Sequence, residues 1–344
     1  MKPEPENPIY GDDWYPIERL ADLPPMLQVI VDTEEEFDWN APFNRQSIGV
    51  ESIRGQSKLR QIYKDHNVRP TYAVDYPVAS QATGYTDLRE LLESNECLIG
   101  AHLQPWVNLP DEEEICDYNS YPGNLTPDLE RRKLEALTET ITRNFGQRPV
   151  IYKAGRYGLG PKTFHTLAEM GYLVDLSPVP YNDMRYKYGP DFSRIRPCPY
   201  WINSPGGLLS IPLTRGFFGP LSRYGEGLNK LLDAPLARAL RLRGALSRTH
   251  LLAHSTLTPE GVPVDEQIRL AEEMIARGYR IFSLTYHSPS LEPGHTPYVR
   301  SEADLSIFIR SIERFLDAFF NRFGGQPTDP LSLRALLLKR REQA

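Results

Sequence analysis

Eight short apolar runs recur along the 344-residue chain, and most of them end in a polar or charged residue. The runs cover residues 25–32, 68–75, 97–102, 149–155, 171–177, 207–213, 250–255 and 279–287. A parallel strand that is buried on both faces reads as a continuous apolar run of this length. Each run is therefore predicted to be a buried strand.

Amphipathic stretches lie between several of the runs, at residues 51–66, 126–146, 160–171 and 258–278. The second has Thr126 as an N-cap, Pro127 at the first helical position and Gly146 as a stop, so it is predicted to be a helix. Repeated strand and helix segments predict parallel strands with helices outside, in a doubly wound sheet or a (β/α) barrel. About eight repeats favour the barrel, which makes the predicted fold class α/β.

The composition is that of an ordinary globular protein, and a chain of this length can form one domain or two. Because no clear linker or internal repeat is visible, a single domain over residues 1–344 is predicted, with an extension at 1–24 and a helical tail at 325–344. Residues 181–207 are predicted to form a long loop over one end of the barrel. No apolar stretch of about 18 residues is present, which argues against an integral membrane segment. The Pro-rich, acidic first residues lack the apolar core of a secretory signal, so a cytoplasmic location is expected.

Charge and motif content exclude several classes of protein. A net charge of -6 argues against nucleic acid as a partner, because phosphate binding needs a basic face. The chain contains no Gly-rich dinucleotide or P-loop motif. Cys97, Cys116 and Cys198 are far apart and contain no CxxC pair, so neither a disulfide framework nor a zinc-thiolate site is predicted. The oligomeric state is not indicated by any pattern.

Polar side chains stand at the ends of most predicted strands, where folds of this class place their chemistry. They are Asp32, which is followed by Glu34, Glu35, Glu36 and Asp38, and then Asp75, His102, Lys153, Arg156, Asp175 and His287. An acidic run is usually a solvated surface, and a lone histidine is usually structural, but convergence on one rim favours a functional site. His254 is a weaker competitor, because its strand also ends on this rim.

The order of these segments resembles the polysaccharide deacetylase family, the carbohydrate esterases that include chitooligosaccharide deacetylases. The resemblance runs through "VIVDTEEEFDW", "IGAHLQPW", "YKAGRYG", "YLVDLS" and "FSLTYHSPSLEPG". The stretch "YHSPSLEPGHTPYVR" is most similar to a WalW-like bacterial subgroup, found with lipopolysaccharide and exopolysaccharide genes. The resemblance implies an irregular (β/α) barrel of about seven strands that uses a divalent metal to remove N- or O-acetyl groups from sugars.

At the first strand, the resemblance makes Asp32 the general base. The family has a metal-binding aspartate at the next position, where this chain has Thr33. Glu34 or Glu35 would then take the place of that ligand. At the third strand, His102 corresponds to the first of two metal-binding histidines. The second falls on Trp106 or on Gln104, depending on the spacing used, and neither is an imidazole.

At the later strands, Lys153 stands where the family has an arginine, and Arg156 is close enough in sequence to act instead. His287 corresponds to the general acid, and Asp175 or Arg156 would tune the charge of its partner. A backbone N–H near Tyr157 would stabilise the oxyanion.

The resulting site has three groups of residues. The catalytic set is Asp32, His287, Arg156 and Asp175, the metal set is Glu34, His102 and Gln104, and the substrate-binding set is Asp75, Trp106, Lys153 and Tyr157. Zinc is the expected ion, because bound Zn²⁺ lowers the pKa of water from about 15.7 to about 7. Since a neutral amide is a weak zinc ligand, weaker affinity or a harder ion is expected.

Three hypotheses follow for the function. The first is a hydrolase of C–N or ester bonds on a glycan or glycan precursor, with a weak or altered metal site. The second is a non-catalytic carbohydrate-binding relative in a polysaccharide pathway. The third is a metal-independent amidohydrolase that acts on a small molecule, as in the allantoinase-like branch of the same fold.

Overall fold

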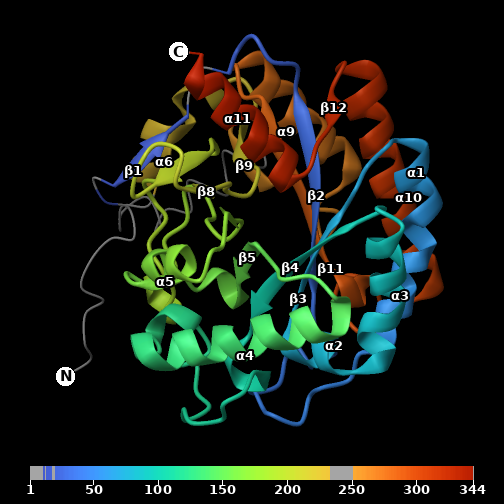
Figure 1. Cartoon of the computed structure of the whole chain (residues 1–344). Helices are drawn as coiled ribbons and strands as arrows, with labels where there is room; N and C mark the ends of the chain where they lie inside the picture. Colours follow the sequence, from blue (N-terminus) through green and yellow to red (C-terminus); the bar gives the residue numbers. More distant parts are fainter. Residues whose placement is uncertain (1–10, 12, 18–19, 233–250, 344) are drawn as a thin grey trace.

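Seven parallel strands form the centre of the molecule in the computed structural model, which describes residues 11, 13–17, 20–232 and 251–343 (Figure 1). Their spatial order is β11 (Ile281–His287), β2 (Met26–Thr33), β3 (Thr71–Val74), β4 (Leu98–Leu103), β5 (Ile151–Ala154), β6 (Val174–Asp175) and β8 (Leu208–Ser210). Each strand pairs in parallel with its neighbour. Seven of the eight predicted strands are thereby confirmed in one sheet.

The remaining predicted run, at residues 250–255, overlaps β10 (Ala253–Thr256), which pairs antiparallel with β9 (Arg215–Phe218) in a separate two-stranded sheet. Loop contacts bridge the opening between β11 and β8. The Leu257 N–H donates to the Thr214 carbonyl at 2.8 Å, and the Thr285 N–H donates to the Leu257 carbonyl at 3.2 Å. The Ser283 N–H of β11 donates to Thr214 Oγ1 at 2.7 Å. The result is an irregular (β/α) barrel, as predicted.

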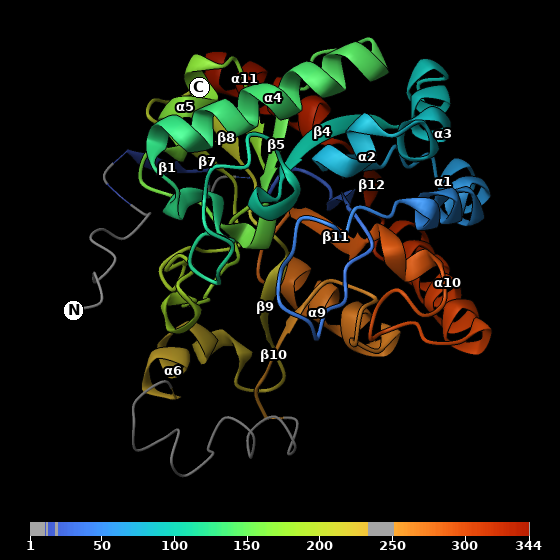
Figure 2. The same ribbon diagram turned by 90° about the horizontal axis from the view of Figure 1, so that it is seen from below.

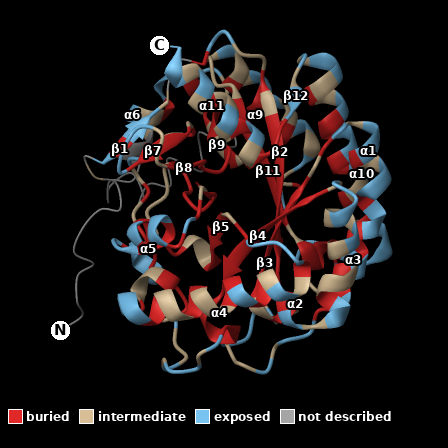
Figure 3. Ribbon diagram, viewed as in Figure 1, coloured by how far each residue is buried: buried red, intermediate tan, exposed pale blue. Residues whose placement is uncertain are grey.

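Helices surround the strands, with their outer faces exposed and the strands buried (Figures 2 and 3). They are α1 (Arg60–Asp65), α2 (Tyr76–Ser80), α3 (Ala82–Glu93), α4 (Pro127–Phe145), α5 (Thr163–Glu169), α6 (Gly225–Leu232), α9 (Val264–Ala276) and α10 (Glu302–Asp317). Thr126 caps α4 by accepting from the Leu129 N–H, and Gly146 ends it at φ 73°. Both predicted boundaries of this helix are confirmed. The predicted helix at 51–66 is divided into a 3-10 segment, η1 (Glu51–Leu59), and α1.

The two ends of the chain also pack on the barrel. Within the predicted extension at 1–24, β1 (Trp14–Pro16) pairs antiparallel with β7 (Tyr200–Ile202), which continues the sheet beyond β8. The predicted loop at 181–207 therefore contains a strand. In the tail, β12 (Gln326–Pro327) pairs with β2, and α11 (Pro330–Glu342) is capped by Asp329. No helix among these described residues is long and apolar enough to cross a membrane.

The two-residue period of the strands separates the two faces of the sheet. Val29 and Val31 of β2 belong to the large core between strands and helices, whereas Ile30 belongs to a second cluster. That cluster also contains Leu98, Ile151 and Ile281 from other strands and Leu333 and Leu337 of α11. We place it inside the barrel, where α11 covers the end at which the strands begin. Every second residue of a strand lies on the same face, so this face of each of these four strands ends in a polar residue. The four polar residues are Asp32, His102, Lys153 and His287.

Candidate functional site

Asp32 and Lys153 form a buried ion pair across the barrel interior. Lys153 Nζ donates a hydrogen bond to Asp32 Oδ1, and both residues are almost fully buried. β3 and β4 separate the strands that carry them, so this contact spans the enclosed interior. Burial alone would raise the pKa of Asp32, but the charges of Lys153, His102 and His287 outweigh it and hold the pKa below its usual range. Asp32 is therefore a carboxylate at neutral pH.

His287 faces the other oxygen of Asp32. The two residues are register partners on adjacent strands, and His287 Nε2 lies 3.7 Å from Asp32 Oδ2. Glu260 holds the rest of the imidazole: its Oε2 lies 2.7 Å from Nδ1, and its Oε1 accepts from the His287 backbone N–H. Burial alone would lower the pKa of His287, but Glu260 above all, with Glu34 and Asp32, raises it to about 10. The imidazole is therefore protonated when Asp32 is not.

Glu260 was missed at the sequence level. It follows β10 by four residues, since that strand ends at Thr256, and it lies near the start of a stretch that was predicted to be helical. The structure places it before α9, in a segment where Ser290 Oγ also donates to its carboxylate. The signal that could have found it is an acidic residue shortly after the apolar run at residues 250–255.

Glu34, His102 and Gln104 converge on one point beside Asp32. The Gln104 amide Nε2 donates to Glu34 Oε2, and His102 Nε2 lies 3.6 Å from the same oxygen. His102 Nδ1 lies 3.0 Å from the Lys153 carbonyl oxygen. Because a carbonyl only accepts, Nδ1 carries a hydrogen, and Nε2 is the ring nitrogen that faces Glu34. The predicted convergence of these three side chains is thus present.

These residues do not fit a catalytic zinc site, which usually has three protein ligands. Glu34 and His102 supply two strong donors, but Gln104 presents its amide nitrogen and occupies one Glu34 oxygen. The other oxygen, Oε1, is buried without a hydrogen-bond partner among the described residues. Within that same part of the chain, no group of three His, Cys, Asp or Glu side chains could hold a metal ion. The site lacks one strong ligand.

Glu35, the other predicted carboxylate ligand, points to a different set of partners. Trp106 Nε1 donates to Glu35 Oε1 at 2.8 Å, and the Glu35 N–H donates to Asp75 Oδ2 at 2.7 Å. Asp75 also accepts from the Val78 N–H and caps α2. Burial raises the pKa of Asp75 to about 6, while burial and the neighbouring Asp75 raise that of Glu35 well above its usual range. Glu35 is therefore not placed as the metal ligand.

The assignment of Asp75 and Trp106 to substrate binding disagrees with these contacts. Asp75 has no exposed surface and Trp106 is 3% exposed. Their polar atoms are already committed to the backbone and to Glu35. Both residues are buried, and their hydrogen bonds to Glu35 hold the segment after β2 in place.

The two other predicted catalytic residues lie apart from the Asp32–His287 contact. Arg156 donates to Ser120 Oγ, and its guanidinium lies 4.2 Å from the ring centre of Tyr121. Its φ of 52° places it in the left-handed region, in the turn that follows β5. Asp175 accepts from Ser177 and Ser210 hydroxyls, and burial raises its pKa to about 6. Neither residue contacts His287, whose charged partner is Glu260.

Tyr157 remains close to the site. Its ring centre lies 5.4 Å from Lys153 Nζ, and its φ is 60°. Two consecutive non-glycine residues, Arg156 and Tyr157, thus adopt the left-handed conformation, which costs roughly 1–3 kcal/mol each and is typical of functional turns.

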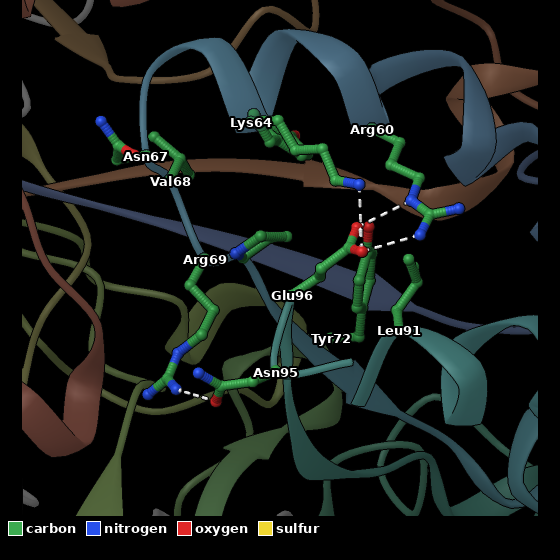
Figure 4. A pocket seen from close by; sticks show the side chains of 11 residues that line it. Arg60, Lys64, Asn67, Val68, Arg69, Tyr72, Leu91, Asn95 and Glu96 are labelled. Atoms are coloured by element: carbon green, nitrogen blue, oxygen red, sulfur yellow. Dashed lines mark hydrogen bonds and ion pairs between the residues drawn. The ribbon is translucent and has the colours of Figure 1, made fainter. Parts of the chain in front are cut away.

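A hollow lies at the end of the strands opposite to Asp32 and His287 (Figure 4). Its volume is about 300 Å³, and it lies beside the residues that precede β3 and β4. Its charges are paired with one another: Glu96 contacts Arg60 at 2.7 Å and Lys64 at 3.1 Å, and Arg69 donates to Asn95 at 2.6 Å. Because catalytic groups of parallel α/β folds lie at the ends of the strands and not at their beginnings, this hollow is not the candidate active site.

Comparison with known proteins identifies the fold. No family model matches the chain, and no curated protein matches it. A solved structure from Mycobacterium smegmatis, described as a candidate polysaccharide deacetylase, matches with a TM-score of 0.52 at 15% identity, covering 95% of this chain and 94% of that one. The structure of PuuE allantoinase matches with a TM-score of 0.50 at 14% identity, covering 92% of this chain and 95% of that one. At these identities the likeness establishes a shared (β/α) barrel fold.

Proposed function

We propose that this barrel is a hydrolase that removes acetyl groups from the amide, or ester, of a glycan or glycan precursor. The observation that carries the proposal is the contact between Asp32 and His287, whose pKa values are shifted in opposite directions. A carboxylate facing a protonated imidazole at the same strand ends supplies a general base and a general acid, which together can carry out acyl hydrolysis. The fold shared with the two solved structures supports this choice of reaction class.

Asp32 would accept a proton from a water molecule as the water oxygen attacks the acetyl carbonyl carbon. His287 would then donate its Nε2 proton to the leaving nitrogen or oxygen as the bond to the carbonyl carbon breaks. Lys153 keeps Asp32 ionised, and Glu260 holds the His287 ring so that Nε2 faces Asp32. The backbone N–H of Tyr157, in the strained turn after β5, is the proposed donor to the oxyanion.

The substrate and its setting remain proposals from the sequence. The likeness of "YHSPSLEPGHTPYVR" to the WalW-like subgroup supports a role in surface polysaccharide or lipopolysaccharide metabolism. No step above depends on a metal, because Glu34, His102 and Gln104 do not complete a zinc site.

The test is acetate release from a panel of acetylated sugars, with the wild-type protein and with Asp32→Asn and His287→Gln. Each variant should lose roughly 10²–10⁴-fold of kcat, the range expected for a general base or acid. Arg156→Lys is the control, because Arg156 was predicted to be catalytic but lies apart from the Asp32–His287 contact. This variant should keep most of the activity. Full activity in Asp32→Asn would overturn the proposal, and sugar binding without turnover would indicate a non-catalytic carbohydrate-binding protein.

One observation favours a second candidate, a metal-independent amidohydrolase that acts on a small molecule. The hydrogen bond from Gln104 satisfies a Glu34 oxygen that a metal would otherwise need. This candidate predicts that hydrolysis of small cyclic amides or ureides survives prolonged treatment with a chelator. Acetate release that stops after chelation and returns with Zn²⁺ or Co²⁺ would reject it.

A further inference from the structure

A loop of residues 37–48, blue in Figure 2, crosses the end of the barrel at which β2 and β11 end. None of its residues belongs to a helix or a strand. Its two ends are close together, because the Glu36 N–H donates to the Gly49 carbonyl at 2.8 Å, and Gln81 Nε2 donates to the Ile48 carbonyl at 2.7 Å. A surface loop whose ends meet in this way is an Ω-loop, a type of loop that is frequently functional.

The Asp32–His287 contact beneath this loop is almost closed to solvent. Asp32 is 3% exposed, and the side chain of His287 is 21% exposed. The ring of Trp39 lies edge-on to the His287 ring, with centres 5.0 Å apart and planes at 88°. Because Asp32 would act on a water that attacks an acetyl group, that group must reach the same place. The open surface is too small for it to enter, so this arrangement is a closed one.

Trp39 lies between His287 and an open cleft of about 730 Å³. Trp39 and residues 294–297 line this cleft, whereas His287 is not part of its lining. The indole N–H of Trp39 is buried and has no acceptor among the described residues. A buried donor without a partner is unfavourable, so the closed position of Trp39 is disfavoured by a group that water would satisfy if the loop moved outward.

The aromatic side chains of the loop pack on one another and on a neighbouring loop. Phe37 and Trp39 are stacked with ring centres 5.0 Å apart, and the ring centre of Phe43 lies 4.5 Å from that of Trp106. In the described part of the chain, none of Phe37, Trp39 and Phe43 belongs to a hydrophobic core cluster or packs against one. Displacement of the loop about its two ends would therefore leave the core intact.

Arg45 holds the far side of the loop through polar contacts. Its Nε lies 3.2 Å from Asp111 Oδ1, and its Nη2 donates to the Glu113 carbonyl at 2.6 Å. Both partners follow β4, so these contacts join the loop to another part of the same end of the barrel. Arg45 is partly exposed and Asp111 is exposed. Because water competes for ion pairs at the surface, these contacts are weak enough to break and form again.

We propose that the 37–48 loop is a lid over the Asp32–His287 contact, in which Trp39 blocks the site and Arg45 holds the lid closed. Substrate enters only while the lid is open, so the open fraction limits kcat/KM. The lid controls access to the site, whichever bond the site hydrolyses. The kinetic measurement below rests on the proposed deacetylase function, and the labelling measurement does not.

The first measurement is the labelling rate of His287→Cys with iodoacetamide in the folded protein. Peptide mass spectrometry separates this thiol from the three native cysteines. Because position 287 lies under Trp39, its labelling rate reports the open fraction of the lid. Adding Arg45→Ala should raise the rate roughly threefold to tenfold. Adding Trp39→Ala should raise it further, and Arg45→Ala should then have no additional effect.

The matched control is Arg314→Ala, which removes an exposed 3.0 Å ion pair with Asp265 between α10 and α9. Added to His287→Cys, it should leave the labelling rate unchanged. The second measurement is kcat/KM for acetate release, in proteins that keep His287. Arg45→Ala should raise kcat/KM by about the same factor as it raises labelling, and Arg314→Ala should not change it.

Equal labelling rates with Arg45→Ala and with Arg314→Ala would overturn the proposal. Labelling of His287→Cys alone that is as fast as with Trp39→Ala would also overturn it, because the site would then already be open. Faster labelling without a rise in kcat/KM would show that the loop does not control substrate entry. If the wild type releases no acetate, the proposed function fails, and the labelling rates still decide whether the lid exists.

Discussion

Replacing Gln104 by histidine should convert the incomplete ligand set into a zinc site. Residues 102 and 104 lie two apart at the end of β4, so an extended chain directs both side chains to one face. The Gln104 amide nitrogen already lies within hydrogen-bonding distance of Glu34, and His102 Nε2 is 3.6 Å from the same oxygen. An imidazole nitrogen at that place would join Glu34 and His102 as a third strong ligand.

The magnitude follows from the free energy of zinc binding per ligand. Four-ligand structural sites bind zinc with about 10–16 kcal/mol, or roughly 2.5–4 kcal/mol for each ligand. The Gln104→His variant should therefore bind zinc roughly 10²–10³-fold more tightly than the wild type. The bond from His102 Nδ1 to the Lys153 carbonyl favours this result, because it already fixes the tautomer that a metal needs.

Competition with a chelator of known affinity measures the change. Gln104→Asn provides the control, because it keeps an amide and adds no imidazole, and it should leave zinc affinity near that of the wild type. His102→Ala in the Gln104→His background should abolish the gain. If Gln104→His shows a native circular dichroism spectrum but no gain in affinity, then the side chain at this position does not face Glu34, and the reasoning fails.

Three further predictions concern the charges and the framework of the site. Lys153→Met removes the hydrogen-bonded cation from the buried Asp32 carboxylate, so urea denaturation should show a loss of about 3–5 kcal/mol in unfolding free energy, with a much smaller loss for Lys153→Arg. Equal losses would show that packing and not charge is involved. Because the folded-state pKa of His287 is raised, its protonation stabilises the fold fully below pH 6.5 and ceases to do so as the pH rises through about 10. In Glu260→Gln, this loss of stability and the alkaline limb of the pH–activity profile should both move toward neutral pH. An alkaline limb that stays at the wild-type pH would show that Glu260 does not raise the pKa of His287. Thr126→Ala removes the cap of α4 and should cost about 1 kcal/mol of stability without changing kcat, as thermal unfolding and acetate release would show.

Four residues of the site could be predicted from the sequence because the strands have a strong signal. Asp32, His102, Lys153 and His287 each lie at the end of a buried apolar run or within two residues of it, and each lies on the face that points into the barrel. The predicted strand positions also placed them on one rim. Glu260 escaped prediction, since it belongs to a loop segment whose course depends on the tertiary fold.

The residues whose roles differ from prediction show what strand position alone does not determine. Asp75 ends its strand too, but Pro77 follows it and the chain turns at once into α2, so its carboxylate caps the helix. Arg156 lies in a left-handed turn that a non-glycine residue rarely adopts, so its direction does not follow from sequence spacing. Gln104 is the opposite case, because its place two residues after His102 already indicated its direction.

The pairing of β2 with β11 also determines when the site can form during synthesis. Asp32 and Lys153 are translated early, whereas His287 follows Asp32 by about 250 residues and must emerge from the ribosome before the two strands can align. Until then, one edge of β2 has no β11 partner and presents unpaired backbone groups that favour association with other chains. A nascent chain that stops before β11 should therefore be inactive and prone to aggregation, even though most of the barrel strands are already present.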